Sequence, residues 1–165
     1  MFLKGKFCQL RSIEERDLPL LLTWRNKPHV LQNMEYQEPI SMEQHRKWHQ
    51  YILSNKYHYF IIETLQEIPV GTIYISGKTD DNGAESGLYI GNEDYIGTGI
   101  TVEASHMIIN YAFNTLKLAY LTAKVKSSNS LVITYNQALV FKIDSEINAQ
   151  FLRMKLSAKD ANIVH

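Results

Sequence analysis

The stretch from Gly91 to Ala104, GNEDYIGTGITVEA, has the residue types of an anion-binding turn. Gly97 and Gly99 stand between a predicted strand that ends near Gly91 and a predicted helix that begins near Thr101. The first turn of a helix has backbone N–H groups without intrahelical partners and carries a partial positive charge. A phosphate can therefore bind there without a lysine or arginine, and this stretch contains neither. A strand–glycine–helix turn with a purely structural role shows the same pattern.

Two nucleotide-binding motifs do not fit this stretch. A Walker loop ends in Gly-Lys followed by Ser or Thr, and that ending is absent. The dinucleotide fingerprint places its glycines after the first strand, and the position of its third glycine is Val102 here. If this stretch has a function, the pattern therefore favours a phosphate site formed by backbone amides.

The surrounding pattern predicts alternating strands and helices that would hold this turn. Alternating or β-branched runs predict strands at 6–13, 57–64, 68–76, 85–91, 119–125, 140–144 and 149–156. Helical spacing predicts helices at 14–26, 41–55, 101–116 and 130–139. Ser41 and Gln44 form a plausible capping box for the second of these helices. The order indicates a mixed α/β sheet with hairpins early and one β-α-β crossover late.

The composition indicates an ordinary globular protein and excludes several other classes of protein. The 165 residues suit one domain, 1–165, and 45% are hydrophobic, as in ordinary globular proteins. Seventeen Lys and Arg balance seventeen Asp and Glu, which argues against a nucleic-acid partner. The single cysteine, Cys8, excludes an internal disulfide and a cysteine zinc site, and the histidines show no metal-ligand spacing, so we expect no metal. Without a membrane-length apolar run or a signal peptide, we expect no membrane partner and a cytoplasmic location.

Three segments together resemble the GNAT superfamily of acyl-CoA-dependent N-acetyltransferases: ESGLYIGNEDYIGTGITVEA, LTAKV and NSLVITYNQALVF. The resemblance extends from about Phe7 to Leu156. It implies a GNAT fold, with a mixed central sheet of six to seven strands, a splayed strand pair and about four flanking helices. It also implies acetyl-CoA as co-substrate. The family's pyrophosphate loop maps onto 96–101, where its arginine is Ile96 and its last small residue is Thr101, so the backbone donors remain but the cation does not.

The resemblance assigns the acetyl-CoA site residue by residue. It pairs the pantetheine arm with the backbone of Leu88, Tyr89, Ile90 and Gly91, and it places the pyrophosphate at Gly97, Thr98, Gly99, Ile100 and Thr101. The hydroxyls of Thr98 and Thr101 are expected to add hydrogen bonds to phosphate. Asn129, with Phe141 at the family's aromatic spacing, and Asn136 complete the set.

On the acceptor side, the segment WRNKPHVLQNMEYQEPISMEQHRKW resembles the nucleotide-sugar N-acetyltransferases of pseudaminic acid biosynthesis. Ribosomal-protein N-terminal acetyltransferases share a looser version of the pattern. The resemblance implies an acceptor pocket formed by Arg25, Asn26, Met34, His45 and Trp48. A guanidinium suits the phosphates of a nucleotide sugar, and an aromatic or imidazole face suits its base. Two plainer readings stay open: His45 and Trp48 as part of a buried stripe with Ile52, and Arg25 as a complement to its helix dipole.

The reaction requires further groups. A neutral amine attacks the thioester carbonyl directly, so a base or a water relay must take its proton. Glu85 shares a strand face with Tyr89 by two-residue alternation and is the first candidate base, acting through water; its plainer reading is a solvated carboxylate at the start of a strand. His45 is the second candidate base. A backbone N–H near Tyr89–Gly91 is the candidate oxyanion donor. Cys8 is expected in the core, so we expect no covalent acyl-enzyme intermediate.

The proton donor for the departing thiolate is less well defined. The family usually has a tyrosine at the position of Asn136, whereas this chain has Tyr135, one residue earlier. A one-residue shift turns a helical side chain by roughly 100°. Tyr135 is therefore either the general acid or a core aromatic.

Three hypotheses for function follow. The first is an acetyl-CoA-dependent transferase that acetylates the amine of a nucleotide-linked amino sugar, in a monomer or a homodimer. The second is an N-acetyltransferase for a protein N-terminus or another small amine. The third is an acetyl-CoA-binding module without turnover, which the displaced tyrosine and the missing arginine keep open.

Overall fold

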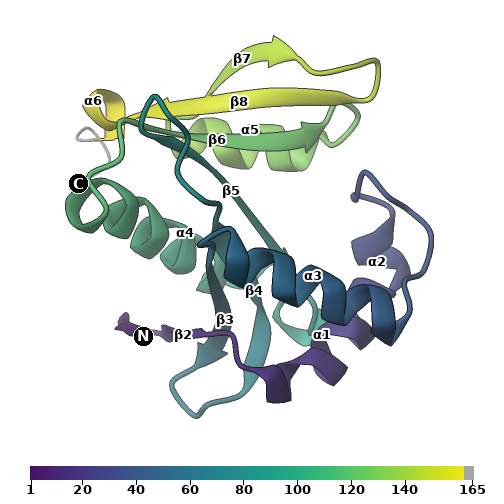
Figure 1. The fold of residues 1–165 in the computed structure, drawn as a ribbon. Helices are drawn as coiled ribbons and strands as arrows, with labels where there is room; N and C mark the ends of the chain where they lie inside the picture. The colour runs from purple at the N-terminus through teal and green to yellow at the C-terminus, as the bar shows by residue number, and fades with distance from the viewer. Residues whose placement is uncertain (162–165) are drawn as a thin grey trace.

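The computed structural model describes residues 1–161, which form an eight-stranded mixed sheet in the order β1-β2-β3-β4-β5-β6-β8-β7 (Figure 1). The strands are β1 (Phe2–Lys4), β2 (Cys8–Ser12), β3 (His58–Thr64), β4 (Pro69–Ile75), β5 (Gly83–Ile90), β6 (Tyr120–Lys126), β7 (Lys142–Glu146) and β8 (Phe151–Ser157). Neighbouring strands are antiparallel except for β5 and β6, which are parallel and joined by a helical crossover. The predicted mixed sheet is therefore confirmed. Residues 162–165 of the expected domain lie outside the described part.

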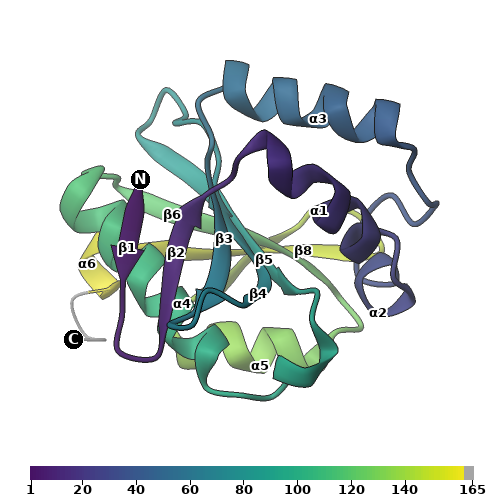
Figure 2. The same ribbon diagram turned by 90° about the horizontal axis from the view of Figure 1, so that it is seen from below.

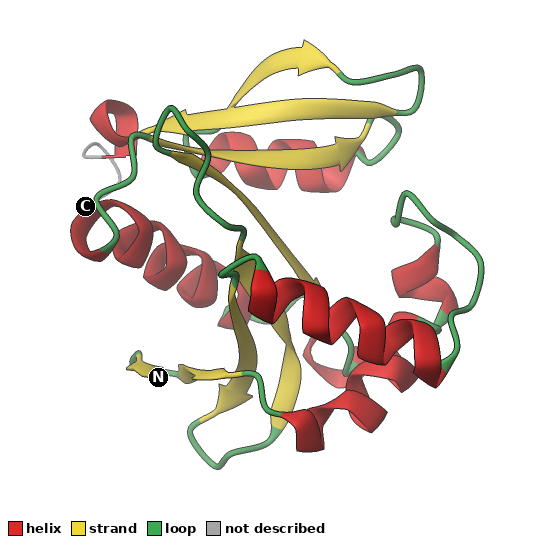
Figure 3. Cartoon of the chain, in the orientation of Figure 1, coloured by secondary structure: helices red, strands yellow, loops and turns green. Residues whose placement is uncertain are grey.

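Helices flank both faces of the sheet (Figure 3). They are α1 (Leu18–Arg25), α2 (Pro28–Leu31), α3 (Met42–Ser54), α4 (Ile100–Asn110), α5 (Ser130–Ala138) and α6 (Ala158–Ala161), with a π-helical turn, Tyr111–Thr115, after α4. The predicted capping box begins α3: the Gln44 amide donates to Ser41 Oγ at 3.2 Å, and the Ser41 amide donates to Gln44 Oε1 at 2.8 Å. Each of these bonds satisfies a backbone N–H of the first turn that has no intrahelical partner.

The counts differ from the predicted six to seven strands and about four helices for a simple reason. The additional strand, β1, has three residues, and the additional helices, α2 and α6, have four residues each. Segments of this length are too short for a periodic pattern to appear. The predicted helix at 14–26 is also divided, into a 3-10 turn at Glu15–Asp17 and α1.

The two faces of the sheet bury separate sets of side chains. Phe60 and Ile62 of β3 belong to the large core cluster with α4 residues such as Ile108, whereas Ile61 packs with Leu21 of α1. This separation follows from the two-residue alternation of a strand. Figure 2 shows the result: α1 and α3 cover one face, and α5 lies on the other.

The parallel strands β5 and β6 separate along their length. They are paired only from Gly83–Glu85 to Tyr120–Thr122. Beyond these residues β5 remains paired with β4, and β6 remains paired with β8, so the two strands diverge (Figure 1). The predicted splayed strand pair is confirmed, and it divides the sheet at the point where the site residues lie.

Candidate functional site

A cavity of about 390 Å³ occupies the gap between the diverging strands β5 and β6. Its walls come from these two strands and from α4 and α5. Of the residues predicted for acetyl-CoA or for its thiolate, the cavity contacts Leu88, Gly97, Thr101, Tyr135 and Asn136. The structure therefore brings together residues that are up to 48 positions apart in sequence, from Leu88 to Asn136.

The backbone of β5 exposes alternate peptide groups to this gap. The Gly91 amide donates to Val70 O at 3.0 Å, on the β4 side. Because backbone direction alternates along a strand, Tyr89 also faces β4, whereas Leu88 and Ile90 turn their N–H and C=O groups toward β6. Pantetheine pairing can thus use Leu88 and Ile90. The expected oxyanion donors are corrected accordingly: the Gly91 amide is already bonded, and the amides that face the gap are those of Leu88 and Ile90.

The glycine turn has the geometry that an anion site requires. Gly97 has a φ of +79°, which a residue with a side chain adopts only at a cost. Gly99 is the N-cap of α4, and the first amide of this turn that bonds back is Glu103 N, which donates to Gly99 O at 3.2 Å. A Cβ at either glycine would meet nothing within 4 Å, so the space beside the first turn is open. The amides of residues 99–102 can therefore donate to a phosphate.

The two threonine hydroxyls of this turn have a different role from the predicted one. Thr98 Oγ1 donates to Tyr95 O at 2.7 Å, and Thr101 Oγ1 donates to Thr98 O at 3.3 Å. Each hydroxyl has a single proton, which is used within the turn. These side chains shape the loop, and the backbone amides at the start of α4 are the donors that remain for an anion.

One carboxylate just before the turn, that of Glu93, lies beside basic side chains. Glu93 Oε1 lies 3.6 Å from Lys27 Nζ and 3.8 Å from His29 Nδ1. The same two residues contact the end of β5, since Lys27 Nζ donates to Gly91 O at 3.1 Å and His29 Nε2 lies 2.9 Å from Ile90 O. Lys27, between α1 and α2, and His29, within α2, therefore face Glu93 and hold the end of β5.

Tyr135 links the two helices that border the gap. Its hydroxyl donates to Thr101 O at 2.9 Å and lies 2.8 Å from Ser105 Oγ. Burial raises the pKa of Tyr135, so the phenol keeps its proton at neutral pH. Asn136, at the family's usual tyrosine position, contacts Met154 Sδ at 3.7 Å. Tyr135 thus supplies a protonated hydroxyl at the cavity wall.

Asn129 is a helix cap in this structure. Its side chain accepts from Val132 N at 3.3 Å as the N-cap of α5, and its Nδ2 donates to Asn33 Oδ1 at 3.3 Å. It does not line the cavity between β5 and β6. The structure therefore does not support its predicted direct contact with acetyl-CoA, whereas Phe141 does line that cavity.

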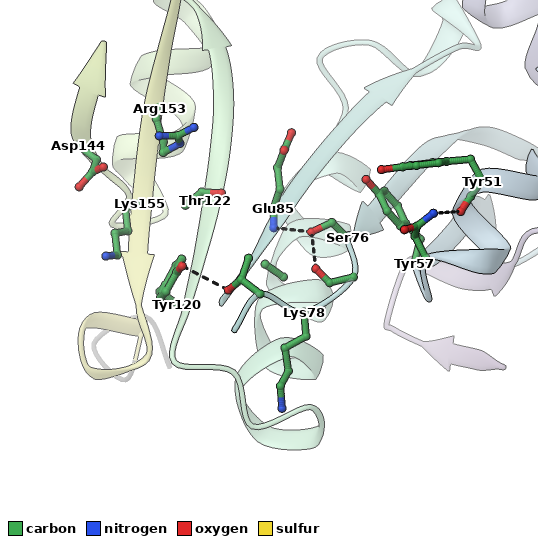
Figure 4. A pocket seen from close by; sticks show the side chains of 14 residues that line it. Tyr51, Tyr57, Ser76, Lys78, Glu85, Tyr120, Thr122, Asp144, Arg153 and Lys155 are labelled. Carbon is green, nitrogen blue, oxygen red and sulfur yellow. Dashed lines mark hydrogen bonds between the residues drawn. The ribbon is translucent and has the colours of Figure 1, made fainter. Parts of the chain in front are cut away.

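A second cavity, of about 570 Å³, lies where β5 and β6 are still paired. It is lined by residues of α3, β5, β6 and β8, including Tyr51, Tyr57, Glu85, Tyr120, Arg153 and Lys155. Figure 4 shows Arg153 and Lys155 on one side of Glu85, and Tyr51 and Tyr57 on the other. Of these residues, sequence reasoning found only Glu85. The signal for the cations is the alternation of Arg153 and Lys155 with buried Met154 and Leu156 along β8.

The Glu85 side chain is held in place at this cavity. Tyr74 Oη donates to Glu85 Oε1 at 3.1 Å, and the Glu85 amide donates to Ser76 Oγ at 2.8 Å. Burial, with a contribution from the Glu85 carboxylate, raises the pKa of Tyr74 well above its usual value, so Tyr74 remains a donor. The ring of Tyr74 stacks on that of Tyr59 at a centroid distance of 5.6 Å. Glu85 is thus a carboxylate in a fixed position beside the point where the strands separate.

Arg25 and Asn26 stabilise the segment after α2 and line neither cavity. Arg25 Nη2 donates to Tyr36 O at 2.9 Å, and burial lowers the pKa of Arg25. Asn26 uses both ends of its amide, because its Nδ2 donates to Ile40 O at 3.0 Å and its Oδ1 accepts from Ile40 N at 2.9 Å. The predicted acceptor role of Asn26 is corrected to that of a loop clamp.

His45 is buried, as the plainer reading of its helix proposed. It is 3% exposed and stacks on Trp48 at a centroid distance of 4.9 Å. Burial lowers the pKa of His45, so the imidazole is neutral at neutral pH. Trp48 and Met34 are half-buried, and neither lines a cavity with Glu85. His45 is therefore corrected to a core residue, and it is not in place to act as a base.

The described residues offer neither a metal site nor a reactive thiol. Among residues 1–161, no group of three or more His, Cys, Asp or Glu side chains could hold a metal ion. Cys8 is buried, and burial followed by the Glu103 carboxylate raises its pKa to about 12, so its thiol is not a nucleophile at neutral pH. No helix in the described part of the chain is long and apolar enough to cross a membrane.

Several solved structures share this fold at low sequence identity. Spermidine N-acetyltransferase from Vibrio cholerae, in complex with CoA and spermine, has a TM-score of 0.83 and 18% identity, over 94% of this chain and 98% of that chain. Apo FdhC, described as a nucleotide-linked sugar GNAT, has a TM-score of 0.83 and 19% identity, over 99% and 93%. A GNAT-family acetyltransferase from Bacillus anthracis has a TM-score of 0.81 and 16% identity, over 96% and 99%.

The family itself is shown by sequence. A comparison with curated proteins gave no significant match. A family model described as the acetyltransferase (GNAT) domain matches residues 8–135, from β2 into the first part of α5, and hence the gap between β5 and β6 together with the glycine turn. The chain therefore belongs to the GNAT family of acetyl-CoA-dependent N-acetyltransferases.

Proposed function

We propose that this acetyltransferase acts on the amine of a nucleotide-linked amino sugar. The observation that carries the proposal is the charge of the cavity around Glu85. Its lining includes the cations Lys78, Arg153 and Lys155, against the carboxylates Glu85 and Asp144. If Glu85 is reserved for the reacting amine, the rest of the wall favours an anionic acceptor.

The fold does not distinguish between the candidate acceptors, but their charge does. Structures described as a spermidine N-acetyltransferase and as a nucleotide-linked sugar GNAT resemble this chain equally well, with TM-scores of 0.83. A polyamine carries several positive charges and would be repelled by this lining, whereas a diphosphate would be attracted. A peptide N-terminus has no fixed negative group to match these cations.

The two cavities lie on either side of the point where β5 and β6 separate, as direct transfer requires. Acetyl-CoA would enter between the strands, with its pyrophosphate at the first turn of α4 and its pantetheine along Leu88 and Ile90. The acceptor amine would approach from the side of Glu85. The thioester carbonyl then lies between the two cavities.

The residues at this junction can perform the proton transfers. Glu85 takes the proton of the amine, directly or through a water molecule, and the nitrogen lone pair forms the new C–N bond. The carbonyl becomes an oxyanion, for which an amide of Leu88 or Ile90 is the candidate donor. When the C–S bond breaks, the electron pair leaves on sulfur, and Tyr135 is the candidate that protonates the thiolate.

Release of free CoA thiol across a panel of acceptors tests this proposal. The panel consists of nucleotide-linked amino sugars, the same amino sugars without the nucleotide, a polyamine and a short peptide with a free N-terminus. We expect turnover with a nucleotide-linked sugar and a much lower kcat/KM for its free counterpart. Preference for the polyamine or the peptide would contradict the proposal.

Glu85→Gln tests the catalytic part. We expect its turnover to fall by roughly 10²-fold or more, because a general base typically contributes 10²–10⁴-fold. The affinity for acetyl-CoA should hardly change. Glu67→Gln, which removes an exposed carboxylate from the turn between β3 and β4, is the matched control and should retain the parent's activity.

A further inference from the structure

The face of β6, β8 and β7 that bears Arg153 has an unusual arrangement of charge. The cross-strand register places Lys124 opposite Arg153 and Lys142 opposite Lys155. Residues directly opposite each other in an antiparallel pair project from the same face, and like charges in such pairs are destabilising. Two such pairs lie next to each other in a chain whose formal net charge is zero. A local arrangement that lowers stability is most often found at a functional site.

Only the outer members of these pairs have acidic partners. Lys124 Nζ lies 2.5 Å from Glu35 Oε2, and Lys142 Nζ lies 3.5 Å from Asp160 Oδ2. Arg153 and Lys155 form no ion pair with any carboxylate of the described residues.

Arg153 and Lys155, the two members of these pairs without ion pairs, both line the cavity around Glu85, together with Lys78. Lys155 Nζ lies over the ring of Tyr120, 4.3 Å from its centroid, which fixes the position of the ammonium without neutralising it. Asp144 lines the same cavity but makes no ion pair with Arg153 or Lys155. The uncompensated charge therefore faces the space where the acceptor would bind.

We infer that Arg153 and Lys155 form the diphosphate subsite of the acceptor cavity, and this inference rests on the proposed function above. Arginine can bind two phosphate oxygens with its planar guanidinium, and lysine adds a point charge beside it. Both residues lie on one side of Glu85 in Figure 4, so an acceptor can place its amine at Glu85 and its phosphates against β8. The subsite replaces Arg25, which lies outside this cavity, as the group that recognises phosphate.

The test is a calorimetric titration of the CoA-saturated enzyme with uridine diphosphate, and separately with inorganic pyrophosphate. Saturation with CoA fills the anion site at the first turn of α4, so further binding reports on another site. We expect the diphosphate to bind the parent protein. Arg153→Gln and Lys155→Gln should each weaken binding by roughly 10-fold or more, which corresponds to about 1.4 kcal/mol, because each variant loses a charge-assisted contact with a phosphate. The affinity of both variants for acetyl-CoA should remain that of the parent.

Arg16→Gln is the matched control, since it removes an arginine charge from an exposed position whose ion pair, within residues 1–161, is with Glu14. It should bind the diphosphate as the parent does, and higher ionic strength should weaken binding in the parent more than in Arg153→Gln. Absence of binding to the CoA-saturated parent, or equal binding by the parent and both variants, would overturn the inference.

Kinetics distinguish failure of this inference from failure of the proposed function. The inference predicts that Arg153→Gln raises KM for a nucleotide-linked sugar while kcat and the KM for acetyl-CoA remain near those of the parent. If the parent uses nucleotide-linked sugars and Arg153→Gln has an unchanged KM, the subsite is wrong and the proposed function stands. If the parent uses only a polyamine or a peptide, the proposed function fails, whatever the titration shows.

Discussion

At the scale of single residues, the position of the tyrosine on α5 matters most for the chemistry. Tyr135 stands one residue before the family's usual position, which Asn136 occupies, yet both side chains reach the cavity between β5 and β6. The displacement therefore does not remove a hydroxyl from the cavity wall. The bonds of Tyr135 to Thr101 and Ser105 do give it a structural role beside the chemical one.

Replacement of Tyr135 by Phe separates these roles. If the phenol protonates the thiolate, turnover should fall by roughly 10²-fold or more, while the affinity for acetyl-CoA, measured by calorimetry, should change little. Ser105→Ala is the control, because it removes a hydrogen-bond partner of Tyr135 and keeps the phenol. Activity of Tyr135→Phe within a few-fold of the parent would leave the protonation to water or to Asn136.

At the scale of elements, the first turn of α4 and the glycines before it define the anion site. The turn contains no cation, so binding depends on backbone amides and on the free space beside them. Lys27, before α2, and His29, within α2, support this arrangement, since both contact the end of β5 and face Glu93.

A pair of substitutions at Gly99 tests this site. Gly99→Glu should abolish acetyl-CoA binding, because a carboxylate would occupy the phosphate position and repel it. Gly99→Ala should bind almost as the parent does, because the φ of Gly99 is −69° and an added Cβ would meet nothing within 4 Å. Unchanged acetyl-CoA affinity of Gly99→Glu in calorimetry would show that the pyrophosphate binds elsewhere.

At the scale of the whole molecule, a buried ion network joins the turn before α1 to the sheet. Arg11 of β2 donates to both oxygens of Asp17, each at 2.9 Å, and its Nε donates to Glu63 Oε1 of β3 at 2.6 Å. The side chains are 15%, 10% and 6% exposed for Arg11, Asp17 and Glu63. Removal of the cation would leave two carboxylates without their charge partner in a buried position.

Arg11→Met should therefore lower the free energy of unfolding by about 3–5 kcal/mol at neutral pH, as measured by denaturant titration. Arg16→Met, at an exposed position, should change it by less than about 0.5 kcal/mol. An Arg11→Met variant as stable as the parent would show that the network does not stabilise the fold.

The same variant should alter the dependence of stability on pH. Burial acts to raise the pKa of Asp17, but the hydrogen bonds from Arg11 and from the backbone of Glu14 outweigh it, and the pKa lies below its ordinary value of 3.8. A lowered carboxyl pKa stabilises the fold above the ordinary value, and this contribution is lost as the pH falls through the folded-state value. The difference in unfolding free energy between the parent and Arg11→Met should therefore decrease as the pH falls below 3.8.

The sequence by itself determined the local elements and the cofactor side of the site. Periodicity places Phe60 and Ile62 opposite Ile61 because a strand alternates its faces whatever it packs against. The glycine turn is predictable for a similar reason: Gly97 and Gly99 precede a helix, and a helix begins with free amides in any fold. Such features depend on residues that are close together in the chain, so they can be predicted from the sequence.

Only the tertiary structure decided which side chains face the acceptor. The helical pattern could not show whether His45 faces a cavity or the core, because it does not reveal what packs against α3. Arg153 comes beside Glu85 only through the pairing of β5 with β6 and of β6 with β8. The pairs of like charges that face each other across the strands appear only in that register. Contacts between residues distant in the chain depend on how strands pair and separate, and no local pattern of residues encodes that arrangement.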